Sequence, residues 1–496
     1  MLEYIKNEAN LTLTENGAVT YKSTGSECLD LFATIGAMRN ASDEEIISRF
    51  MRAYTENADI AMKLLFFARD VRGGLGERKV FRVIMNWLSQ NEPATVEKNI
   101  KYVAEFGRYD DLLVLMGTDC EEKMLEYLRA QFENDCVNMD EGRDISLLAK
   151  WLPSVNASSV TTVRMGKKIA KAFGLSEATY RKQLSALRAY LNIIENNLRE
   201  KDYNFDYEKQ PSRALFKYRQ AFFRNDRERY GEFLSKVEIG EAKLNASNVC
   251  PYELVETYLT DGWYGRSSSF MKNISEEEKR SLNATWEALT DFGGDENAIV
   301  VVDTSGSMYC DFKPLPAAVA LSLGLYFAER NKGIYKNHFI EFSERPQLIE
   351  IKGETFADRL RYIASFNEIA NTNLEAVFDL ILDAAVKNKV SAEELPAKLI
   401  IVSDMEFDRC VENADLTNFE NAKAKYEANG YKLPEIVFWN VASRRCQQPV
   451  KMNEKGVCLV SGATPRLFEM IAGGNLSPYE FMMEVVTKER YAMIVA

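Results

Sequence analysis

The chain has very little histidine: His338 is the only one in 496 residues. A zinc site built on several histidines is therefore excluded, and any catalytic triad would depend on that single imidazole. The eight cysteines are scattered, and even the closest pair, Cys446 and Cys458, is too far apart for a C-x-x-C motif. This spacing argues against a zinc ribbon or a thioredoxin-type redox pair and predicts reduced thiols.

Long apolar runs are also missing, because no stretch approaches the roughly 18 apolar residues of a membrane-spanning helix. The first ten residues are polar and acidic, where a signal peptide needs a basic and then an apolar stretch. We therefore expect a cytoplasmic protein without a membrane segment, and a monomer. With 46% hydrophobic residues and only 12 prolines the chain should be globular, and its length predicts at least two domains.

Residues 1–290 are expected to form the first domain, which is α-helical. From about residue 25 the apolar residues recur at helical spacing, as in Leu29, Phe32 and Ile35. Short helices separated by brief polar breaks are predicted at 44–54, 58–67, 78–89, 95–106 and 110–116. Helices joined this closely stack as antiparallel pairs, which predicts HEAT-like or armadillo-like repeats, although no sequence period is visible.

Residues 291–496 are expected to form a second domain of the α/β class. Continuous apolar, β-branched runs predict strands at 298–302, 338–342, 398–402 and 435–439, and helical patterns alternate with them at 316–329, 374–387 and 419–428. Alternating buried strands and helices require a mostly parallel sheet with helices on both faces. The second domain is therefore predicted to be a doubly wound α/β domain.

A set of oxygen-bearing side chains follows the strands of this domain. The first strand leads into Asp303, Ser305 and Ser307, Thr372 precedes a predicted helix, and Asp404 follows a later strand. The first and fourth strands of a doubly wound sheet flank the point where strand order reverses, so Asp303 and Asp404 should meet there. Oxygen-only ligands favour a hard divalent cation, with Mg²⁺ the first choice and Mn²⁺ or Ca²⁺ as alternatives.

A basic segment interrupts this acidic chain. Between residues 150 and 230 there are 17 Lys and Arg against eight Asp and Glu, whereas the whole chain has a net charge of -12. Cations interleaved with aromatics such as Tyr218 and Phe222 can hold phosphates and stack unpaired bases. The alternative is that these helices pair with acidic neighbours inside the protein. The candidate RNA-binding residues are Arg164, Lys167, Lys168, Lys171, Arg181, Lys182, Arg188, Arg213, Lys217, Arg219 and Arg224.

Two further motifs are interpreted as structural. The glycine-rich stretch from Gly73 to Lys79 follows a helical segment instead of a strand and lacks a G-K-S/T ending, so we expect a helix-to-helix turn and no nucleotide loop. The pair Asp110 and Asp111 is expected to mark a helix N-terminus, where the macrodipole favours negative charge.

The set Asp303, Ser305, Ser307, Thr372 and Asp404 resembles the metal-ion-dependent adhesion site of von Willebrand factor A domains. In that family an open coordination position takes an acidic group from a partner. A helical-repeat domain followed by an A domain resembles the Ro autoantigen-like ribonucleoproteins of the TROVE type, and more closely their uncharacterised bacterial, viral and plant relatives. The resemblance is seen locally in the stretches 16–17, 29–32, 68–78, 109–112, 150–154 and 403–407.

The resemblance implies a ring of helical repeats whose basic inner face and hole take single-stranded ends of noncoding RNA, with the A domain closing the ring. We therefore expect a non-enzymatic, Ro-like RNA-binding scaffold with one divalent cation. The rival hypothesis is a protein-interaction adaptor in which the A-domain cation captures an acidic residue of a partner. A cation-dependent nuclease or ligase is a third hypothesis, disfavoured because no general base accompanies the predicted ligands.

Overall fold

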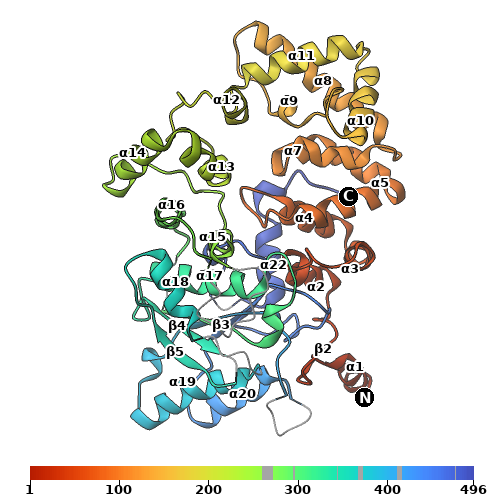
Figure 1. Ribbon diagram of the computed structural model, residues 1–496. Helices are drawn as coiled ribbons and strands as arrows, with labels where there is room; N and C mark the ends of the chain where they lie inside the picture. Colours follow the sequence, from red (N-terminus) through yellow and green to blue (C-terminus); the bar gives the residue numbers. More distant parts are fainter. Residues whose placement is uncertain (260–271, 294–296, 343, 367–371, 410–415, 475) are drawn as a thin grey trace.

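The computed structural model describes residues 1–259, 272–293, 297–342, 344–366, 372–409, 416–474 and 476–496. It has a helical N-terminal part and a C-terminal part built on a sheet (Figure 1). The two predicted classes of domain are therefore confirmed. The predicted boundary at 290/291 falls between the last helix of the first part and the first strand of the main sheet.

The helical part begins with α2 (Glu27–Thr34), α3 (Asp43–Glu56), α4 (Ala58–Arg69) and α5 (Arg78–Asn91), whose apolar faces form one core. Ser42 and Asn57 cap α3 and α4 by accepting from backbone N–H groups with their side chains, which explains why the helices start there. The helices α3, α4 and α5 agree with the predicted ranges to within two residues at each end.

The predicted helix at 95–106 is broken in the structure. It consists of α6 (Pro93–Asn99), the 3₁₀ turn η2 (Ile100–Tyr102) and α7 (Val103–Phe106). The Asn99 amide donates to the carbonyls of Thr95, at 2.8 Å, and Val495, at 2.6 Å. An asparagine side chain that competes for backbone carbonyls weakens a helix interior, and here it also ties the helix to the end of the chain.

The remaining helices of this part continue as an arch that leaves the sheet on one side and returns to it on the other (Figure 1). After the 3₁₀ helix η3 (Tyr109–Leu115) come α8 (Glu121–Asp140), α9 (Leu148–Trp151), α10 (Val160–Ala172), α11 (Glu177–Tyr190), α12 (Ile194–Glu200), α13 (Ser212–Asn225), α14 (Arg227–Glu238), α15 (Pro251–Tyr258) and α16 (Glu276–Glu287).

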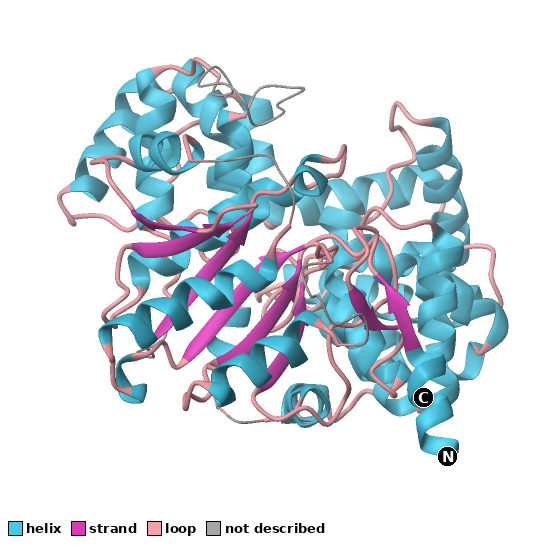
Figure 2. Ribbon diagram, turned by 90° about the horizontal axis from the view of Figure 1, so that it is seen from below, coloured by secondary structure: helices cyan, strands magenta, loops and turns pink. Residues whose placement is uncertain are grey.

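Within the described residues, the main sheet has six strands in the order β5–β4–β3–β6–β7–β8. Figure 2 shows the strands in magenta, with helices packed around them. All neighbours are parallel except β4 and β5, which are antiparallel. The sequence predicted four of these strands and missed β5 and β8. The strands are β3 (Ala298–Asp303), β4 (His338–Phe342), β5 (Gln347–Glu350), β6 (Lys398–Ser403), β7 (Glu435–Asn440) and β8 (Val457–Ser461).

Helices cover both faces of this sheet, as predicted. Alternate residues of β3 point to opposite faces: Val300 and Val302 share a core with α17, and Ile299 and Val301 share another with α19. The predicted adjacency of the first and fourth strands is also confirmed, because β3 pairs with β6. The α-helices are α17 (Pro316–Arg330), α18 (Phe356–Ala364), α19 (Leu374–Asn388), α20 (Asn418–Ala428), α21 (Leu467–Met470) and α22 (Pro478–Val486).

Each end of the chain contacts the other part of the molecule. After α1 (Leu2–Asn10), a hairpin of β1 (Leu11–Leu13) and β2 (Val19–Tyr21) lies against the sheet part and forms bridges from Gly17 to Asp408 and from Tyr21 to Gln448. The C-terminal tail returns to the helical part, where Arg490 pairs with the buried Asp70. The two parts are therefore interlocked.

No helix within the described residues is long and apolar enough to cross a membrane.

The stacking of Trp286 on Phe356 joins α16 to α18, with ring centroids 4.3 Å apart and Trp286 fully buried. Trp286→Ala is expected to lower the free energy of unfolding by about 3–5 kcal/mol, because a large cavity replaces the indole. Urea denaturation followed by circular dichroism measures this. The exposed Met51 provides a control, since Met51→Ala should change stability by no more than about 0.5 kcal/mol. An equal loss in both variants would contradict the role of the stack.

Candidate functional site

The carboxyl ends of β3 and β6 bring Asp303 and Asp404 to one edge of the sheet. Asp303 is the last residue of β3, and Asp404 directly follows β6, which pairs with β3 in parallel. Both carboxylates are buried. The Ser403 hydroxyl donates to Asp303 Oδ2 at 2.5 Å, and the Ser305 backbone N–H donates to Asp303 Oδ1 at 2.9 Å. The loop after β3 therefore turns back over the strand end.

The two serines of this loop lie beside the two carboxylates. The hydroxyl oxygens of Ser305 and Ser307 are 3.1 Å apart, and Ser307 also hydrogen-bonds to Asp404. Four of the five predicted ligands are thus connected through direct contacts. We call the set Asp303, Ser305, Ser307, Thr372 and Asp404 the metal edge.

Thr372 is the fifth predicted ligand. Its carbonyl accepts from the Asp408 N–H at 2.9 Å, which places Thr372 next to the segment that follows Asp404. Its hydroxyl is buried and has no hydrogen-bond partner within the part of the chain that the structure describes. A buried hydroxyl without a partner is costly, and a ligand that binds this oxygen would remove the cost.

The donor set therefore fits a hard divalent cation by its chemistry: two carboxylates and three hydroxyls. No cluster of three or more His, Cys, Asp or Glu side chains suited to a metal occurs among the described residues, so this candidate depends on its hydroxyl oxygens. Cation binding itself stays a prediction.

The electrostatics of the metal edge favour a positive ligand. Burial and the negative charge of Asp404 raise the pKa of Asp303 to about 7. Burial also raises the pKa of Asp404, although the Arg444 guanidinium opposes that rise. Two desolvated carboxylates at one edge disfavour each other's ionised form, and a cation between them would remove this conflict.

Three residues at this edge were not predicted as site residues. Arg444 pairs with Asp404, with Nη2 2.8 Å from Oδ2, and with Glu15, with Nη1 2.8 Å from Oε2. Glu406 is fully buried and accepts from the Glu15 N–H at 2.6 Å. Glu406 belongs to the stretch 403–407 that contributed to the family resemblance, whereas no local pattern marks Glu15 or Arg444 because their partners lie far away in sequence.

A second candidate site is a cavity of about 1180 Å³ between the helical part and the sheet part, which we call the basic cavity. Among the described residues of its lining, Asp43 and Glu253 are the only carboxylates. Aromatic side chains, among them Trp151 and Phe292, complete it. The cationic residues that line it are Arg39, Arg69, Arg72, Arg78, Lys79, Arg82, Arg108, Arg213 and Arg466.

Asp110 and Asp111 hold three of these arginines in place. The fully buried Arg69 pairs with Asp111 at 2.7 Å, and Arg82 pairs with both aspartates. Arg108 pairs with Asp110, and its N–H donates to Asp111. The prediction that this pair marks a helix N-terminus is confirmed for η3, but the sequence missed that the two carboxylates also anchor the cavity wall.

The glycine-rich turn between α4 and α5 brings Arg78 and Lys79 to the cavity. Gly74 is required there because a Cβ would lie 2.0 Å from the carbonyl oxygen of Phe67, and Gly76 has a φ of +71°. The predicted helix-to-helix turn is therefore confirmed. What the sequence did not reveal is that this turn faces a large cavity.

Arg78 lies among other positive charges that are not fully neutralised. Burial and the positive charges of Arg108 and Arg82 lower the pKa of Arg78. Its side chain forms no hydrogen bond or ion pair with any of the described residues, and it is exposed to the cavity. The guanidinium groups of Arg108 and Arg466 lie 3.9 and 5.0 Å from the ring centroids of Trp151 and Phe292, respectively.

The predicted basic helices are only partly available to a ligand. Arg188 donates to the carbonyls of Ala149 and Leu152, and Arg219 pairs with the largely buried Glu278. Internal pairing, which the sequence left open, also holds for Lys167 with Glu177, Lys168 with Glu121 and Arg213 with Glu253, while Lys217 contacts the Tyr218 hydroxyl. The exposed members without a hydrogen-bond or ion-pair partner among the described residues are Arg164, Lys171, Arg181, Lys182 and Arg224.

Comparison with known families matches both parts of the chain. A model described as "Domain of unknown function (DUF2828)" matches residues 14–128 and 122–292. A second model, "Domain of unknown function (DUF7788)", matches residues 297–491. The first covers more than half of the chain and includes the hairpin loop that contacts Glu406.

A similar protein is "Uncharacterized protein L728" of Acanthamoeba polyphaga mimivirus, which is 29% identical over 516 residues, covering 96% of this chain and 87% of that protein. Among solved structures, the RO (RSR) protein of Deinococcus radiodurans aligns over 94% of this chain and 99% of its own, with a TM-score of 0.34 and 10% identity.

The pKa of Asp303 predicts how stability depends on pH when divalent cations are removed. Folding raises this pKa from about 3.8 to about 7, so the native state holds a proton that the unfolded state has lost between these values. The free energy of unfolding should therefore fall as pH rises from 4 to 7, by up to about 1.4 kcal/mol per unit.

Asp303→Asn should flatten this fall, because an amide has no proton to lose. Urea denaturation at several pH values in EDTA measures both proteins. An unchanged slope in the variant would contradict the assigned pKa.

Proposed function

The chain belongs to the family described as DUF2828, and we propose that it is an RNA-binding scaffold that holds single-stranded RNA in its basic cavity. The observation that supports this most is the charge of the cavity lining, with nine cationic side chains in a protein whose net charge is -12. Such segregation is expected where a polyanion binds.

The charge excess remains after internal pairing is taken into account. Within the part of the chain that the structure describes, five carboxylates pair with the lining cations: Asp43, Glu77, Asp110, Asp111 and Glu253. Among the described residues, nine cations against five anions leave a formal excess of four positive charges around the cavity. A phosphate backbone with one charge per nucleotide is a suitable counterpart, and the pairing carboxylates keep the arginines ordered beforehand.

The cavity also has the size and aromatic content for several nucleotides. At about 1180 Å³ it exceeds the usual range of small-molecule pockets, roughly 300–1000 Å³. Arginine forks can hold phosphates in a bidentate manner, and aromatic rings such as those of Trp151 and Phe292 can stack bases without regard to sequence. We infer that the ligand is a single strand, because unpaired bases are needed for stacking.

The metal edge is proposed to hold one divalent cation, with Mg²⁺ the first choice. When bound, the cation supplies two positive charges that offset the buried carboxylates of Asp303 and Asp404. Ser305 and Ser307 bring their hydroxyls together at this edge, Ser403 holds Asp303 in position through its hydrogen bond, and the buried Thr372 hydroxyl, which has no hydrogen-bond partner among the described residues, is proposed as a further ligand. We assign this site a stabilising role in the sheet part and no catalytic role.

The adaptor hypothesis assigns the metal edge to capture of an acidic partner residue. Glu15 of the chain's own hairpin already lies next to this edge, bound to Arg444, so an external carboxylate would compete with it. Asp303→Ala separates the two functions: it should abolish partner capture by an adaptor and spare RNA binding in the basic cavity.

RNA binding is tested by removing cavity cations that have no carboxylate partner in the described structure. The double variant Arg78→Ala/Arg466→Ala should bind a single-stranded RNA oligonucleotide about 100-fold more weakly, since a hydrogen bond to a charged group contributes about 1.5–3 kcal/mol. The slope of log K against log salt should also become shallower by about 1.4, at roughly 0.7 per lost phosphate contact. Fluorescence anisotropy at several salt concentrations measures both.

A matched control removes the same charge outside the cavity. Arg164→Ala/Arg181→Ala changes two exposed arginines on α10 and α11 and should leave affinity within about threefold of the wild type. If this control loses as much affinity as the cavity variant or more, the basic helices bind the RNA and the cavity assignment is wrong.

Cation binding is tested with Mn²⁺ alone by isothermal titration calorimetry. Thr372→Val removes only the hydroxyl oxygen, and Asp404→Asn removes one negative charge; each should weaken Mn²⁺ binding by about tenfold or more. The exposed Thr55 gives a control of the same chemistry, and Thr55→Val should leave affinity unchanged. Wild-type protein that fails to bind Mn²⁺, or a Thr372→Val variant with unchanged affinity, would contradict the assignment.

A further inference from the structure

Arg444 joins two carboxylates that come from opposite ends of the chain. One side of its guanidinium contacts Asp404, a member of the metal edge, and the other contacts Glu15 in the loop between β1 and β2, both at 2.8 Å. The Asp404 side chain is completely buried, whereas the Glu15 side chain is 46% exposed. Arg444 therefore bridges a desolvated carboxylate and a partly hydrated one.

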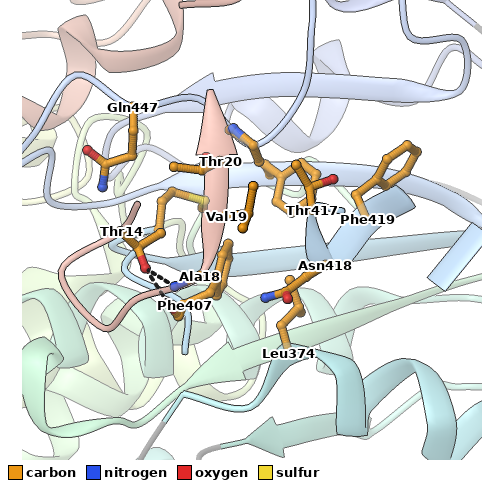
Figure 3. A pocket seen from close by; sticks show the side chains of 13 residues that line it. Thr14, Ala18, Val19, Thr20, Leu374, Phe407, Thr417, Asn418, Phe419 and Gln447 are labelled. Atoms are coloured by element: carbon orange, nitrogen blue, oxygen red, sulfur yellow. Dashed lines mark hydrogen bonds between the residues drawn. The ribbon is translucent and has the colours of Figure 1, made fainter. Parts of the chain in front are cut away.

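The hairpin loop is fixed on this edge by its neighbours. The Thr14 hydroxyl donates to the Phe407 carbonyl at 2.5 Å and accepts from the Ala18 N–H at 2.9 Å, contacts drawn in Figure 3. The Asn16 amide donates to the Glu406 carbonyl at 2.6 Å, and the Glu15 N–H donates to the Glu406 carboxylate. Glu15 is thus held beside Arg444 by contacts that do not involve its own carboxylate.

The charges around Arg444 leave it two possible positions. The carboxylates that act on it electrostatically are Asp404, Glu15 and Glu406, and Glu406 is itself held by the Gln447 amide at 2.7 Å. Arg444 Nε is buried and has no hydrogen-bond partner among the described residues. The guanidinium is therefore incompletely satisfied where it bridges, so moving off Asp404 toward Glu15 costs it one contact and keeps the other.

From this arrangement we propose that Arg444 is a resident counter-ion of the metal edge, which a divalent cation displaces from Asp404 toward Glu15. The inference rests on the cation proposed above and adds two residues to its site. The positive guanidinium neutralises Asp404 when no cation is bound, and it repels a cation that approaches the same carboxylate. Glu15 provides the alternative partner. Because Arg444 stays paired with Glu15 after it leaves Asp404, the hairpin favours cation binding.

This mechanism makes opposite predictions for the two residues. Arg444→Met removes the competing charge and should raise Mn²⁺ affinity by about tenfold or more, in line with the coupling of close charge pairs. Arg444→Lys keeps the charge and should stay near the wild-type affinity. Glu15→Gln leaves Arg444 with Asp404 alone and should lower Mn²⁺ affinity several-fold. In the double variant Glu15→Gln/Arg444→Met the effect of Glu15→Gln should disappear, because Glu15 acts only through Arg444.

Titration calorimetry with Mn²⁺ on the full-length chain gives these affinities, and circular dichroism confirms folding of each variant. Two matched controls make the same substitutions at other exposed positions. Arg445→Met, next to Arg444, matches Arg444→Met, and Glu8→Gln on α1 matches Glu15→Gln. An Arg444→Met affinity that is equal to or lower than that of the wild type would overturn the proposal, as would an effect of Glu15→Gln that persists in the double variant.

The same preparations distinguish this inference from the proposed function. RNA affinity measured on Arg444→Met and Glu15→Gln should equal that of the wild type, because neither residue lines the basic cavity. If wild-type protein binds RNA but not Mn²⁺, the inference fails and the RNA scaffold stands. If Mn²⁺ affinities change as predicted while no variant or wild-type protein binds RNA, the scaffold fails and the inference stands.

Discussion

The wall of the basic cavity depends on one buried carboxylate, that of Asp111. It accepts from Arg69 and Arg82 through their guanidinium groups and from the backbone N–H of Arg108, so residues from α4, α5 and the start of η3 meet at a single side chain. Isolated arginines at these positions would repel one another and spread apart. Anchoring by a desolvated carboxylate keeps them close enough to act on one ligand, at the cost of partial neutralisation.

The interlocked chain ends extend this constraint to the whole molecule. Arg490 and the Tyr491 hydroxyl reach Asp70, immediately after α4, while the hairpin loop binds the segment after β6. The helical part is thereby attached to the sheet part at its beginning as well as at its end. A cavity between the two parts keeps its shape only when both attachments hold, since each part supplies lining residues.

Sequence patterns were most informative where structure is local. Short stretches of sequence were enough to predict the alternation of buried strands with helices. They were also enough to single out the loop from Asp303 to Ser307 and Asp404, which the structure brings to one edge of the sheet. The strands β5 and β8 were missed because both are short: Gln347–Glu350 has four residues, of which three are exposed, and Val457–Ser461 has five.

The basic residues show why the rest could not be predicted. Charge density along the chain identified 164–224, yet Arg188 and Arg219 serve the fold, and most lining cations of the cavity lie outside that range, from Arg39 to Arg108 and at Arg466. These positions converge only through tertiary contacts. Likewise Glu15 and Arg444 are more than 400 residues apart, and nothing in either neighbourhood indicates the other.

The hairpin can dock on the sheet part only after the segment that follows β6 has been synthesised. Glu15 and Glu406 are 391 residues apart, so on the ribosome the hairpin waits for its partner segment for roughly 20–80 s at 5–20 residues per second. During that interval its strands have no sheet to cover them, and a strand of three residues with a threonine at its centre is a poor template for aggregation. The shortness of β1 and β2 thus protects the nascent chain until its far end emerges.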